Sequence, residues 1–496
     1  MNLRMNLRGP QPQGPAATAR AAATAAPRGR AVVVGAGMAG LLAAHVLAPH
    51  YGSVTVVERD RLPPTPQFRK GVPQSRHTHL LLGRGLESLE TLLPGIVGEL
   101  LERGAVPLDW PGDALWLTPA GWSSRFRPGM SIVSASRDLV EWSVRQRVLS
   151  HPGIEVLQAT EVTALIPSSN GKGVAGVRVR DRDEQQEQDI PADLVLDTSG
   201  RGSKASRWLS ELGWQPAQEP SVPTKVSYVS RWYQRPDEAH APDWSLILLQ
   251  TQPPEHTRSG MLLPVDGGRW MVSLVGVGGD DPPTSEEGFL EFARSLRDPV
   301  LYEAIREAKP LSPIHSFRVP DSRRRRYERE RRWPEGFAVI GDALCSLNPM
   351  YAQGMSVAAV TALAVGEELS RRSSRPLGRR IQRRAARSGA DPWLIASGED
   401  LRYLPPHQQG RRPLHASIMQ AYFDRVLRAA RTDATVNAAL LKVLNLQSGP
   451  YSMLRPAVLR RSLLKRQAPA ETRPPQAGPA RSPGSIHASA ERTGVQ

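Results

Sequence analysis

The fold is decided by the stretch Ala31-Val32-Val33-Val34-Gly35-Ala36-Gly37-Met38-Ala39-Gly40, in which a short apolar run meets three closely spaced glycines. The run predicts a buried strand, and the apolar residues 40–47 predict a helix directly after it. Gly35 permits the tight turn, Gly37 lets the backbone approach a pyrophosphate, and Gly40 lets the helix pack closely on the strand. The helix N-terminus adds amide donors and the positive end of a dipole. The stretch therefore predicts a dinucleotide-binding turn.

An acidic residue follows at the distance typical of such a turn. Glu58 lies eighteen residues after Gly40, at the end of a second predicted strand over 53–57. A carboxylate there can accept hydrogen bonds from the adenosine ribose, and it disfavours a 2′-phosphate. We place the neighbouring Arg59 in the same site. The alternative is a glycine-rich turn in an unrelated α/β protein.

A second motif lies about three hundred residues later and reads Val339-Ile340-Gly341-Asp342-Ala343, then Asn348-Pro349 and Gln353-Gly354-Met355. With the first motif, it resembles the flavoprotein monooxygenases of the aromatic-hydroxylase fold. The resemblance implies that the dinucleotide is FAD and that Asp342 binds a ribityl hydroxyl. It also implies that Gly354 and Met355 lie near the flavin ring, with Pro349 in the same segment. A helix N-terminus there would stabilise negative charge on a reduced flavin. A surface Gly-Asp turn is the alternative.

Further binding residues follow from the same resemblance. Ser136-Arg137-Asp138 predicts a helix start, and the family places an arginine here against the FAD phosphates, which makes Arg137 the candidate. Val162 falls where the family contacts the adenine side of the cofactor. The motif Asp197–Ser203 resembles the family's middle motif but lacks its usual Asp-Gly start. This departure counts against direct binding of NAD(P)H by the motif. The motif could equally form a structural turn or contact the cofactor.

A basic loop broken by glycine and proline, Arg69–His79, follows the second strand. We expect it either beside the flavin ring or on the surface as a plain loop. His77 and His79 would share a face of an extended chain, but no carboxylate or cysteine set completes a metal site, so no metal is predicted. Cys345 is the only cysteine. It excludes a disulfide framework and is expected to be a packed residue in a reducing cytoplasm.

The element pattern predicts an α/β fold, with a Rossmann-like FAD-binding domain, an inserted antiparallel β-sheet substrate domain and a C-terminal helical segment. We assign residues 30–220 plus 334–370 to the FAD-binding domain, 221–333 to the substrate-binding sheet and 390–465 to the helical segment. The arginine-rich stretch 371–390 predicts a loop or linker. Residues 1–29 and 466–496 are rich in Ala, Pro and Arg and predict disordered ends. Neither a signal peptide nor a membrane-spanning helix is expected.

Short segments of the chain resemble one group within this family more closely. Segments 71–79, 197–202, 282–284, 322–327 and 341–353 are similar to the actinobacterial flavin-dependent epoxidases of polyether antibiotic biosynthesis (the monensin and lasalocid epoxidase type), which are relatives of squalene epoxidase. This implies epoxidation of alkenes in a linear polyene polyketide through a C4a-hydroperoxyflavin, with O2 as co-substrate. Oxygen transfer of this kind requires no acid or base, so no catalytic residue is assigned. Because no second glycine unit is present, we expect electrons from a separate flavin reductase or from a transient visit of NAD(P)H.

The same residues are compatible with other functions. A flavin-dependent halogenase, an aromatic hydroxylase and an isoprenoid or alkene reductase share the expected fold. The halogenase signature Trp-x-Trp-x-Ile-Pro is missing from the chain. A lipid carrier of the escort type would keep the fold without flavin, and the intact set of glycines and acidic residues counts against it.

The formal net charge of +16 is carried almost entirely by arginine. No zinc-finger spacing or RNA-binding signature accompanies it, so nucleic acid is not expected as a partner, and compositional bias is the plain explanation. Seven of the ten residues in Arg323–Arg332 are arginine, which suggests a dock for an acidic partner such as an acyl carrier protein. The apolar and basic segment Tyr451–Arg466 suggests contact with a membrane surface. We expect a cytoplasmic protein with at most peripheral membrane contact.

Overall fold

The computed structural model describes residues 28–127, 129–404, 414–464 and 473–475. The two ends for which the sequence predicts disorder, 1–29 and 466–496, therefore lie almost wholly outside the described residues.

A five-stranded parallel sheet forms around the glycine turn, with the strand order β17-β11-β1-β2-β7. Ala31 in the central strand pairs with Leu194 on one side and with Val54 on the other. Both faces of this strand are buried, which explains its continuous run of valines. The strands are β1 (Arg28–Val34), β2 (Tyr51–Val57), β7 (Ile154–Leu157), β11 (Leu194–Asp197) and β17 (Phe337–Val339).

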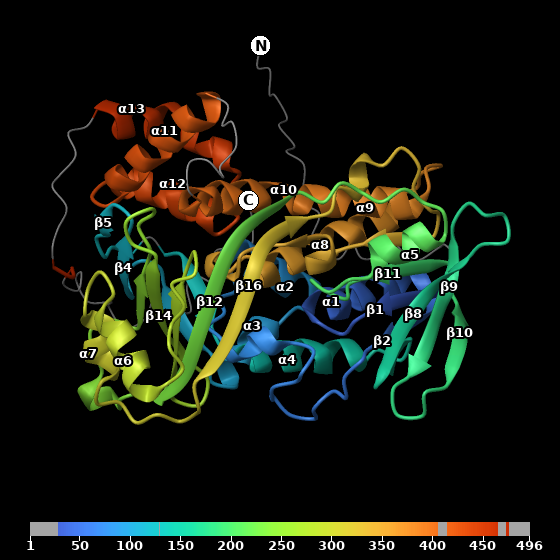
Figure 1. The fold of residues 1–496 in the computed structure, drawn as a ribbon, viewed down its shortest axis with the longest axis horizontal. Coiled ribbons are helices and arrows are strands. Elements are labelled where there is room, and N and C mark those ends of the chain that lie inside the picture. The colour runs from blue at the N-terminus through green and yellow to red at the C-terminus, as the bar shows by residue number, and fades with distance from the viewer. Residues whose placement is uncertain (1–27, 128, 405–413, 465–472, 476–496) are drawn as a thin grey trace, which may run out of the picture.

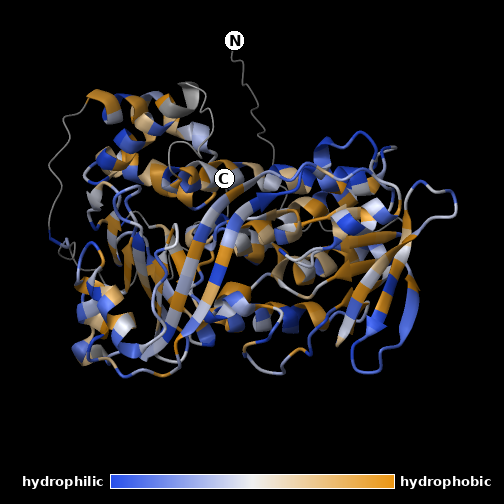
Figure 2. Cartoon of the chain, in the orientation of Figure 1, coloured by the Kyte–Doolittle hydropathy of each residue, from blue (hydrophilic) through white to orange (hydrophobic). Residues whose placement is uncertain are grey.

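Helices cover this sheet. Helix α1 (Met38–Leu47) packs against α8 (Gly354–Ser370) and α4 (Arg137–Leu149). Helices α1 and α8 are apolar around most of their circumference, because both are enclosed by the sheet and by other helices (Figure 2). A small antiparallel sheet of β8 (Thr160–Pro167), β9 (Val174–Asp181) and β10 (Glu187–Pro191) extends beyond the parallel sheet.

The predicted insert forms most of an eight-stranded sheet with the order β18-β16-β12-β15-β14-β13-β4-β5. Its strands are β4 (Ala114–Thr118), β5 (Gly121–Trp122), β12 (Ser221–Gln234), β13 (Leu246–Leu249), β14 (Arg258–Val265), β15 (Arg269–Gly276), β16 (His315–Arg324) and β18 (Cys345–Ser346). The pairing is antiparallel except between β13 and β4. Strands β4, β5 and β18 join the sheet from outside the predicted boundaries 221–333, since β4 pairs with the distant β13, and β5 and β18 form the two edges of the sheet.

The remaining elements complete the layers. They are β3 (Val106–Asp109), paired with β6 (Ser131–Ser134), and the helices α2 (Gly83–Leu92), α3 (Ile96–Glu102), α5 (Ala205–Glu211), α6 (Glu286–Arg294), α7 (Val300–Ile305), α9 (Leu377–Ser388), α10 (Ala390–Asp400), α11 (Leu414–Ala430), α12 (Ala434–Leu444) and α13 (Pro456–Leu464). Helices α8, α9 and α10 run along one long side of the molecule, and α11–α13 lie at the end occupied by β4 and β5 (Figure 1). Across the described ranges, no helix is both long enough and apolar enough to cross a bilayer.

The prediction of a loop or linker over 371–390 is wrong, because α9 occupies Leu377–Ser388. Ile381 and Ala385 recur at helical spacing and are buried, but the arginines between them mask this pattern. Gln382 binds the edge strand β17, since its Nε2 donates to the Val339 carbonyl at 3.1 Å and its Oε1 accepts from the Val339 amide at 2.8 Å. Helix α9 therefore covers the open edge of the parallel sheet.

Candidate functional site

A cavity of about 450 Å³ lies between the parallel sheet and the eight-stranded sheet. Its walls come from the glycine turn after β1, the loop after β17, the start of α8, and strands β12 and β16. Ligands of α/β sheets bind at the carboxyl ends of the strands, and the volume is typical of small-molecule pockets. Of the predicted binding residues, Ala36 and Gly40 are buried outside the lining. The predicted residues that line it are Gly35, Gly37, Met38, Ala39, Glu58, Arg59, Arg137, Val162, Asp342, Pro349, Gly354 and Met355.

The glycine turn has the geometry that the sequence predicts. Gly35 adopts a positive φ of 99°, a conformation that favours glycine. A Cβ on Gly40 would lie 1.8 Å from the Gly35 carbonyl oxygen, so only glycine allows the helix to approach the turn this closely. Helix α1 begins at Met38 with neither a side-chain cap nor an acidic residue in its first turn. Its first amides thus remain available to an anion.

Glu58 is buried at the edge of the cavity and organises the turn. Its Oε2 accepts from the Ala36 amide at 2.7 Å, and its Oε1 accepts from the Asp60 amide at 3.0 Å. Arg69 Nη1 lies 3.3 Å from the same Oε1. A carboxylate can accept about four hydrogen bonds, so Glu58 keeps capacity for a ribose hydroxyl.

Two buried arginines share one buried carboxylate beside the turn. Arg69 Nε donates to Glu141 Oε1 at 2.7 Å, and Arg137 Nη2 lies 2.7 Å from Glu141 Oε2. Burial would raise the pKa of Glu141, but Arg137 and Arg69 lower it, so the carboxylate stays charged. Arg137 Nη1 is buried without a hydrogen-bond partner in the described protein. This unsatisfied cationic donor at the cavity wall calls for an anionic ligand.

The second motif forms the opposite wall. The Asp342 side chain lines the cavity, which lies deep within the protein. The surrounding protein raises the pKa of the Asp342 carboxyl, whereas Arg137 and Arg201 lower it. Helix α8 begins at Gly354, again without a side-chain cap or an acidic first turn. Its N-terminus and Met355 face the cavity. This end of the site therefore offers amide donors where negative charge would be stabilised.

The loop Arg69–His79 lines the cavity and is not a plain surface loop. His77 is only 5% exposed, and its Nδ1 lies 2.7 Å from Ser230 Oγ in β12. Burial lowers the pKa of His77 to about 3, with His79, His315 and Arg76 adding to the shift. The His77 ring packs against Tyr228 and Phe317, with ring centroids 5.9 and 5.6 Å away. His77 is thus a neutral part of the wall at physiological pH.

The motif Asp197–Ser203 forms a structural turn and also reaches the cavity. Asp197 is buried and accepts from Ser199 and Ser203 hydroxyls at 2.6 and 2.5 Å, which is a structural role. Thr198 Oγ1 donates to the Val34 carbonyl at 2.7 Å and fixes the glycine turn. Thr198 and the residues up to 202 also line the cavity.

A buried network around Asp400 has no local signal in the sequence. Asp400, at the end of α10, accepts from Ser322 Oγ at 2.7 Å, Asn348 Nδ2 at 2.8 Å and the Tyr351 hydroxyl at 2.9 Å. The Tyr228 hydroxyl donates to Asn348 Oδ1 at 3.2 Å. The network ties α10 to the large sheet and to the loop before α8, so it positions the wall that carries Pro349.

Cys345 does not line this cavity. Cys345 is buried in β18, and burial raises the pKa of its thiol to about 12. It is therefore a packed, protonated residue. Among the described residues, no group of three or more His, Cys, Asp or Glu side chains is arranged to hold a metal ion.

The polar groups that line the cavity match the parts of FAD. The uncapped start of α1 and the unpaired Nη1 of Arg137 would hold the pyrophosphate. Glu58 would bind the adenosine ribose, Asp342 the ribityl chain, and the start of α8 the flavin end. No local change in the fold is needed to expose these groups.

Comparisons with known proteins agree with this assignment. A family model described as an FAD binding domain matches residues 29–373. Protein Rv3254 of Mycobacterium tuberculosis (strain ATCC 25618 / H37Rv) is 30% identical over 459 residues, which cover 88% of this chain and 94% of that protein.

Solved structures share the fold. The flavin-dependent brominase Bmp2 superposes with a TM-score of 0.63 at 15% identity, covering 87% of this chain and 97% of Bmp2. The p-nitrophenol 4-monooxygenase PnpA from Pseudomonas putida DLL-E4 superposes with a TM-score of 0.59 at 16% identity, covering 85% of this chain and 99% of PnpA. The fold is thus that of flavin-dependent monooxygenases and halogenases. With the family model spanning most of its length, the chain belongs to the FAD-binding domain family, and its cofactor is FAD.

Proposed function

We propose that the protein is an FAD-dependent monooxygenase that uses O2 to epoxidise alkenes of a hydrophobic linear polyene. Membership of the FAD-binding family and the fold shared with flavin monooxygenases support the oxidoreductase part of the proposal. The choice of an alkene as substrate rests on the chemistry of the cavity wall and on the local resemblance of segments such as 71–79 to polyether epoxidases.

The observation that carries the proposal is an uncharged wall on the side of the large sheet. Among the described residues, this sheet contributes Tyr228 and Phe317 to the lining, and neutral His77 packs on both rings. An alkene has no proton to give up and no charge to neutralise, so an aromatic wall of this kind suits it. A phenol or an amine would instead profit from a polar partner.

The residues of the chain would act by binding and exclusion. When bound and reduced, FAD supplies the electrons that let O2 deliver one oxygen atom to the substrate. Glu58, Arg137 and the start of α1 would fix its ADP half, and α8 would stabilise charge at the ring. Tyr228, Phe317 and His77 would keep water from the reacting face.

The partners belong to the same proposal. Electrons would come from a separate flavin reductase, with a transient visit of NAD(P)H as the alternative. The polyene would be delivered free or on an acyl carrier protein, and contact with a membrane surface would be peripheral. Tyr451 and Leu464 in the candidate membrane segment are 71% and 78% exposed, which keeps both side chains accessible to such a surface.

A halogenase is the second candidate, because the chain shares its fold with the brominase Bmp2. The missing Trp-x-Trp-x-Ile-Pro signature counts against it. A halogenase would need halide and would add halogen to the product, so product composition separates the two.

The direct test incubates the FAD-loaded protein with a flavin reductase, NADH, bromide, a linear polyene and ¹⁸O-labelled O2, followed by mass spectrometry. We expect one labelled oxygen atom per reacted double bond and no bromine, with no product when FAD or O2 is omitted. A brominated product, or a product that gains only hydrogen, would overturn the assignment in favour of a halogenase or a reductase.

A further inference from the structure

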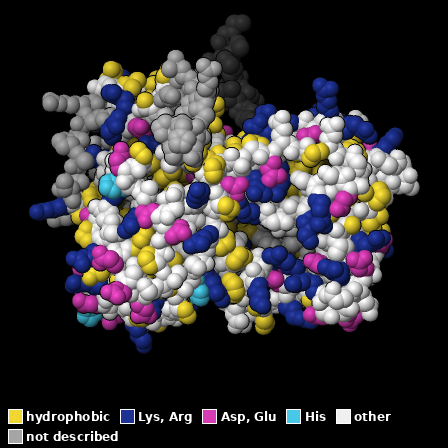
Figure 3. Space-filling view, in the orientation of Figure 1, with side chains coloured by type: hydrophobic (Ala, Val, Ile, Leu, Met, Phe, Trp, Pro, Cys, Tyr) yellow, Lys and Arg dark blue, Asp and Glu magenta, His cyan; other side chains and the backbone are white. Residues whose placement is uncertain are grey.

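A second concave site lies on the outside of the FAD-binding domain, around α9. The stretch from Arg371 to Arg387 contains eight arginines and no acidic residue. These eight positive charges equal half of the formal net charge of +16. Basic side chains are otherwise scattered among acidic ones over the visible face of the molecule (Figure 3). Such a concentration of like charge requires a structural explanation.

The neighbouring basic segment 323–332 is partly neutralised within the chain. Arg323 pairs with Glu219 at 3.0 Å, Arg325 with the same carboxylate at 3.1 Å, and Arg324 with Glu328 at 3.0 Å. Three of the seven arginines that the sequence suggested as a dock are thus paired within the chain. This segment also contains Glu328 and Glu330, whereas the stretch from Arg371 to Arg387 has no acidic residue of its own.

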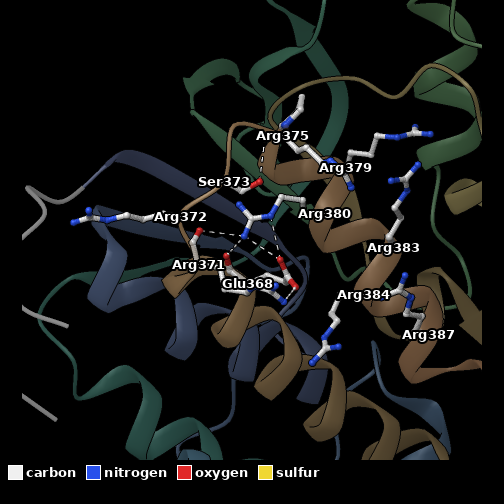
Figure 4. A pocket seen from close by; sticks show the side chains of 11 residues that line it. Glu368, Arg371, Arg372, Ser373, Arg375, Arg379, Arg380, Arg383, Arg384 and Arg387 are labelled. Atoms are coloured by element: carbon white, nitrogen blue, oxygen red, sulfur yellow. Dashed lines mark hydrogen bonds and ion pairs between the residues drawn. The ribbon is translucent and has the colours of Figure 1, made fainter. Parts of the chain in front are cut away.

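The arginines of this stretch line a groove of about 500 Å³ formed by the end of α8, the loop that follows it and α9 (Figure 4). Glu368 is the acidic residue of its lining, and it is already bound by Arg380 at 2.9 Å and Arg371 at 3.4 Å. Arg379 and Arg383 extend away from Glu368 on the other side of α9 (Figure 4). The groove therefore holds cations that its own carboxylate cannot neutralise.

Three of these arginines repeat at helical spacing without an ion-pair partner among the described residues. Arg379, Arg383 and Arg387 lie four residues apart, over a rise of about 12 Å. Like charges at this spacing destabilise a helix. Burial lowers the pKa of Arg379, and Arg383 adds to this shift while Glu330 opposes it. A bound anion would remove this cost.

Helix α9, which carries most of the arginines of the groove, is anchored to the protein core. Ile381 and Ala385 are buried beneath α9, and Gln382 is hydrogen-bonded to the backbone of β17. The arginines are therefore presented by an anchored helix, which limits the ordering cost of binding a ligand.

We propose that this groove binds a small anion that carries several phosphate groups. Planar guanidinium groups match phosphate oxygens in paired hydrogen bonds, and the lining contains arginine but no lysine. The row is longer than a single phosphate needs, so a chain of phosphates fits it better. The lining has no aromatic residue to stack on a base, so recognition is of the phosphates alone. A concave groove of this volume favours a small ligand over the convex surface of an acidic protein.

The test is calorimetric titration of the FAD-loaded full chain with inorganic tripolyphosphate at about 0.15 M salt, where weak surface attraction is screened. FAD loading keeps the probe out of the cofactor cavity. We expect tripolyphosphate to bind at least about 10-fold more tightly than orthophosphate. The double variant R379Q/R383Q should weaken binding by at least about 10-fold, as expected for the loss of charged hydrogen bonds.

The matched control is R294Q/R306Q, which removes the same charge from exposed arginines of α6 and the end of α7. It should bind tripolyphosphate like the native chain, and circular dichroism should show the native helix content in both variants. Equal weakening in the two variants, or binding no tighter than orthophosphate, would overturn the proposal. Tighter binding of poly-L-glutamate or of single-stranded DNA than of tripolyphosphate, lost in R379Q/R383Q, would overturn it in favour of a macromolecular partner.

Discussion

Replacing Gly40 by alanine is expected to weaken FAD binding by about 10- to 100-fold. The new Cβ would meet the Gly35 carbonyl oxygen at 1.8 Å and Thr198 Oγ1 at 2.7 Å, so either the turn or α1 must move. Overpacking of this kind costs about 1–3 kcal/mol, and each 1.4 kcal/mol corresponds to about a tenfold change in affinity. Titration of the apoprotein with FAD, followed by flavin fluorescence, measures the effect.

A matched control is Gly98→Ala in α3, where the added Cβ meets no atom within 4 Å. This variant should bind FAD like the native chain, because alanine suits a helix interior better than glycine. If Gly40→Ala kept native FAD affinity while folding normally, the close approach of α1 to the turn would not be what holds the cofactor.

Acidification should destabilise the protein through His77 by about 2 kcal/mol between pH 6.5 and pH 5. The unfolded chain takes up a proton near the ordinary His pKa of about 6.5, whereas the folded chain resists protonation down to a pKa of about 3. The contribution is therefore fully present above pH 6.5, and it is lost progressively as the pH falls from 6.5 towards 3. Urea unfolding at several pH values measures it.

The informative comparison is between variants, because burial also lowers the pKa of neighbouring His79, to about 4. In His77→Gln, the loss of stability between pH 6.5 and 5 should be about 2 kcal/mol smaller than in the native chain. His240→Gln is the control, since His240 is highly exposed, and it should keep the native pH dependence. A native pH dependence in His77→Gln would show that this imidazole is not held neutral.

The glycine turn was predictable because its chemistry is local. Gly35, Gly37 and Gly40 serve backbone geometry, and that geometry is the same wherever a strand opens directly into a helix. The second motif was predictable for the same reason, since the loop after β17 and the start of α8 are consecutive in the chain. Both motifs line one cavity because parallel strands bring their carboxyl ends to one edge.

Other parts of the site depend on contacts between distant segments, and local patterns do not reveal these. Arg69 meets Glu141 across 72 residues, and Asp400 meets Asn348 across 52 residues. The four-residue spacing of Arg137 and Glu141 on one helix face was the available signal for part of this cluster. The residues of the Asp400 network show no comparable spacing in the sequence.

Helix α9 was missed for a different reason. Its apolar residues, such as Ile381 and Ala385, are few, and the eight arginines from Arg371 to Arg387 suggest a solvated linker. The helix forms because tertiary contacts override this composition, above all the two hydrogen bonds of Gln382 to the edge of β17. Nothing in the sequence indicated that β4 belongs to the large sheet, since its parallel partner β13 lies far along the chain.

The central claim is that the cavity between the two sheets holds FAD, with the ADP half on the glycine turn. Titrating the purified apoprotein with FAD, and recording the flavin absorption bands after removal of free cofactor, tests this most directly. The structure predicts one retained FAD per chain and competition by ADP, which shares the Gly35–Gly40 turn and Glu58. A protein that shows no flavin bands after FAD has been added would contradict the account.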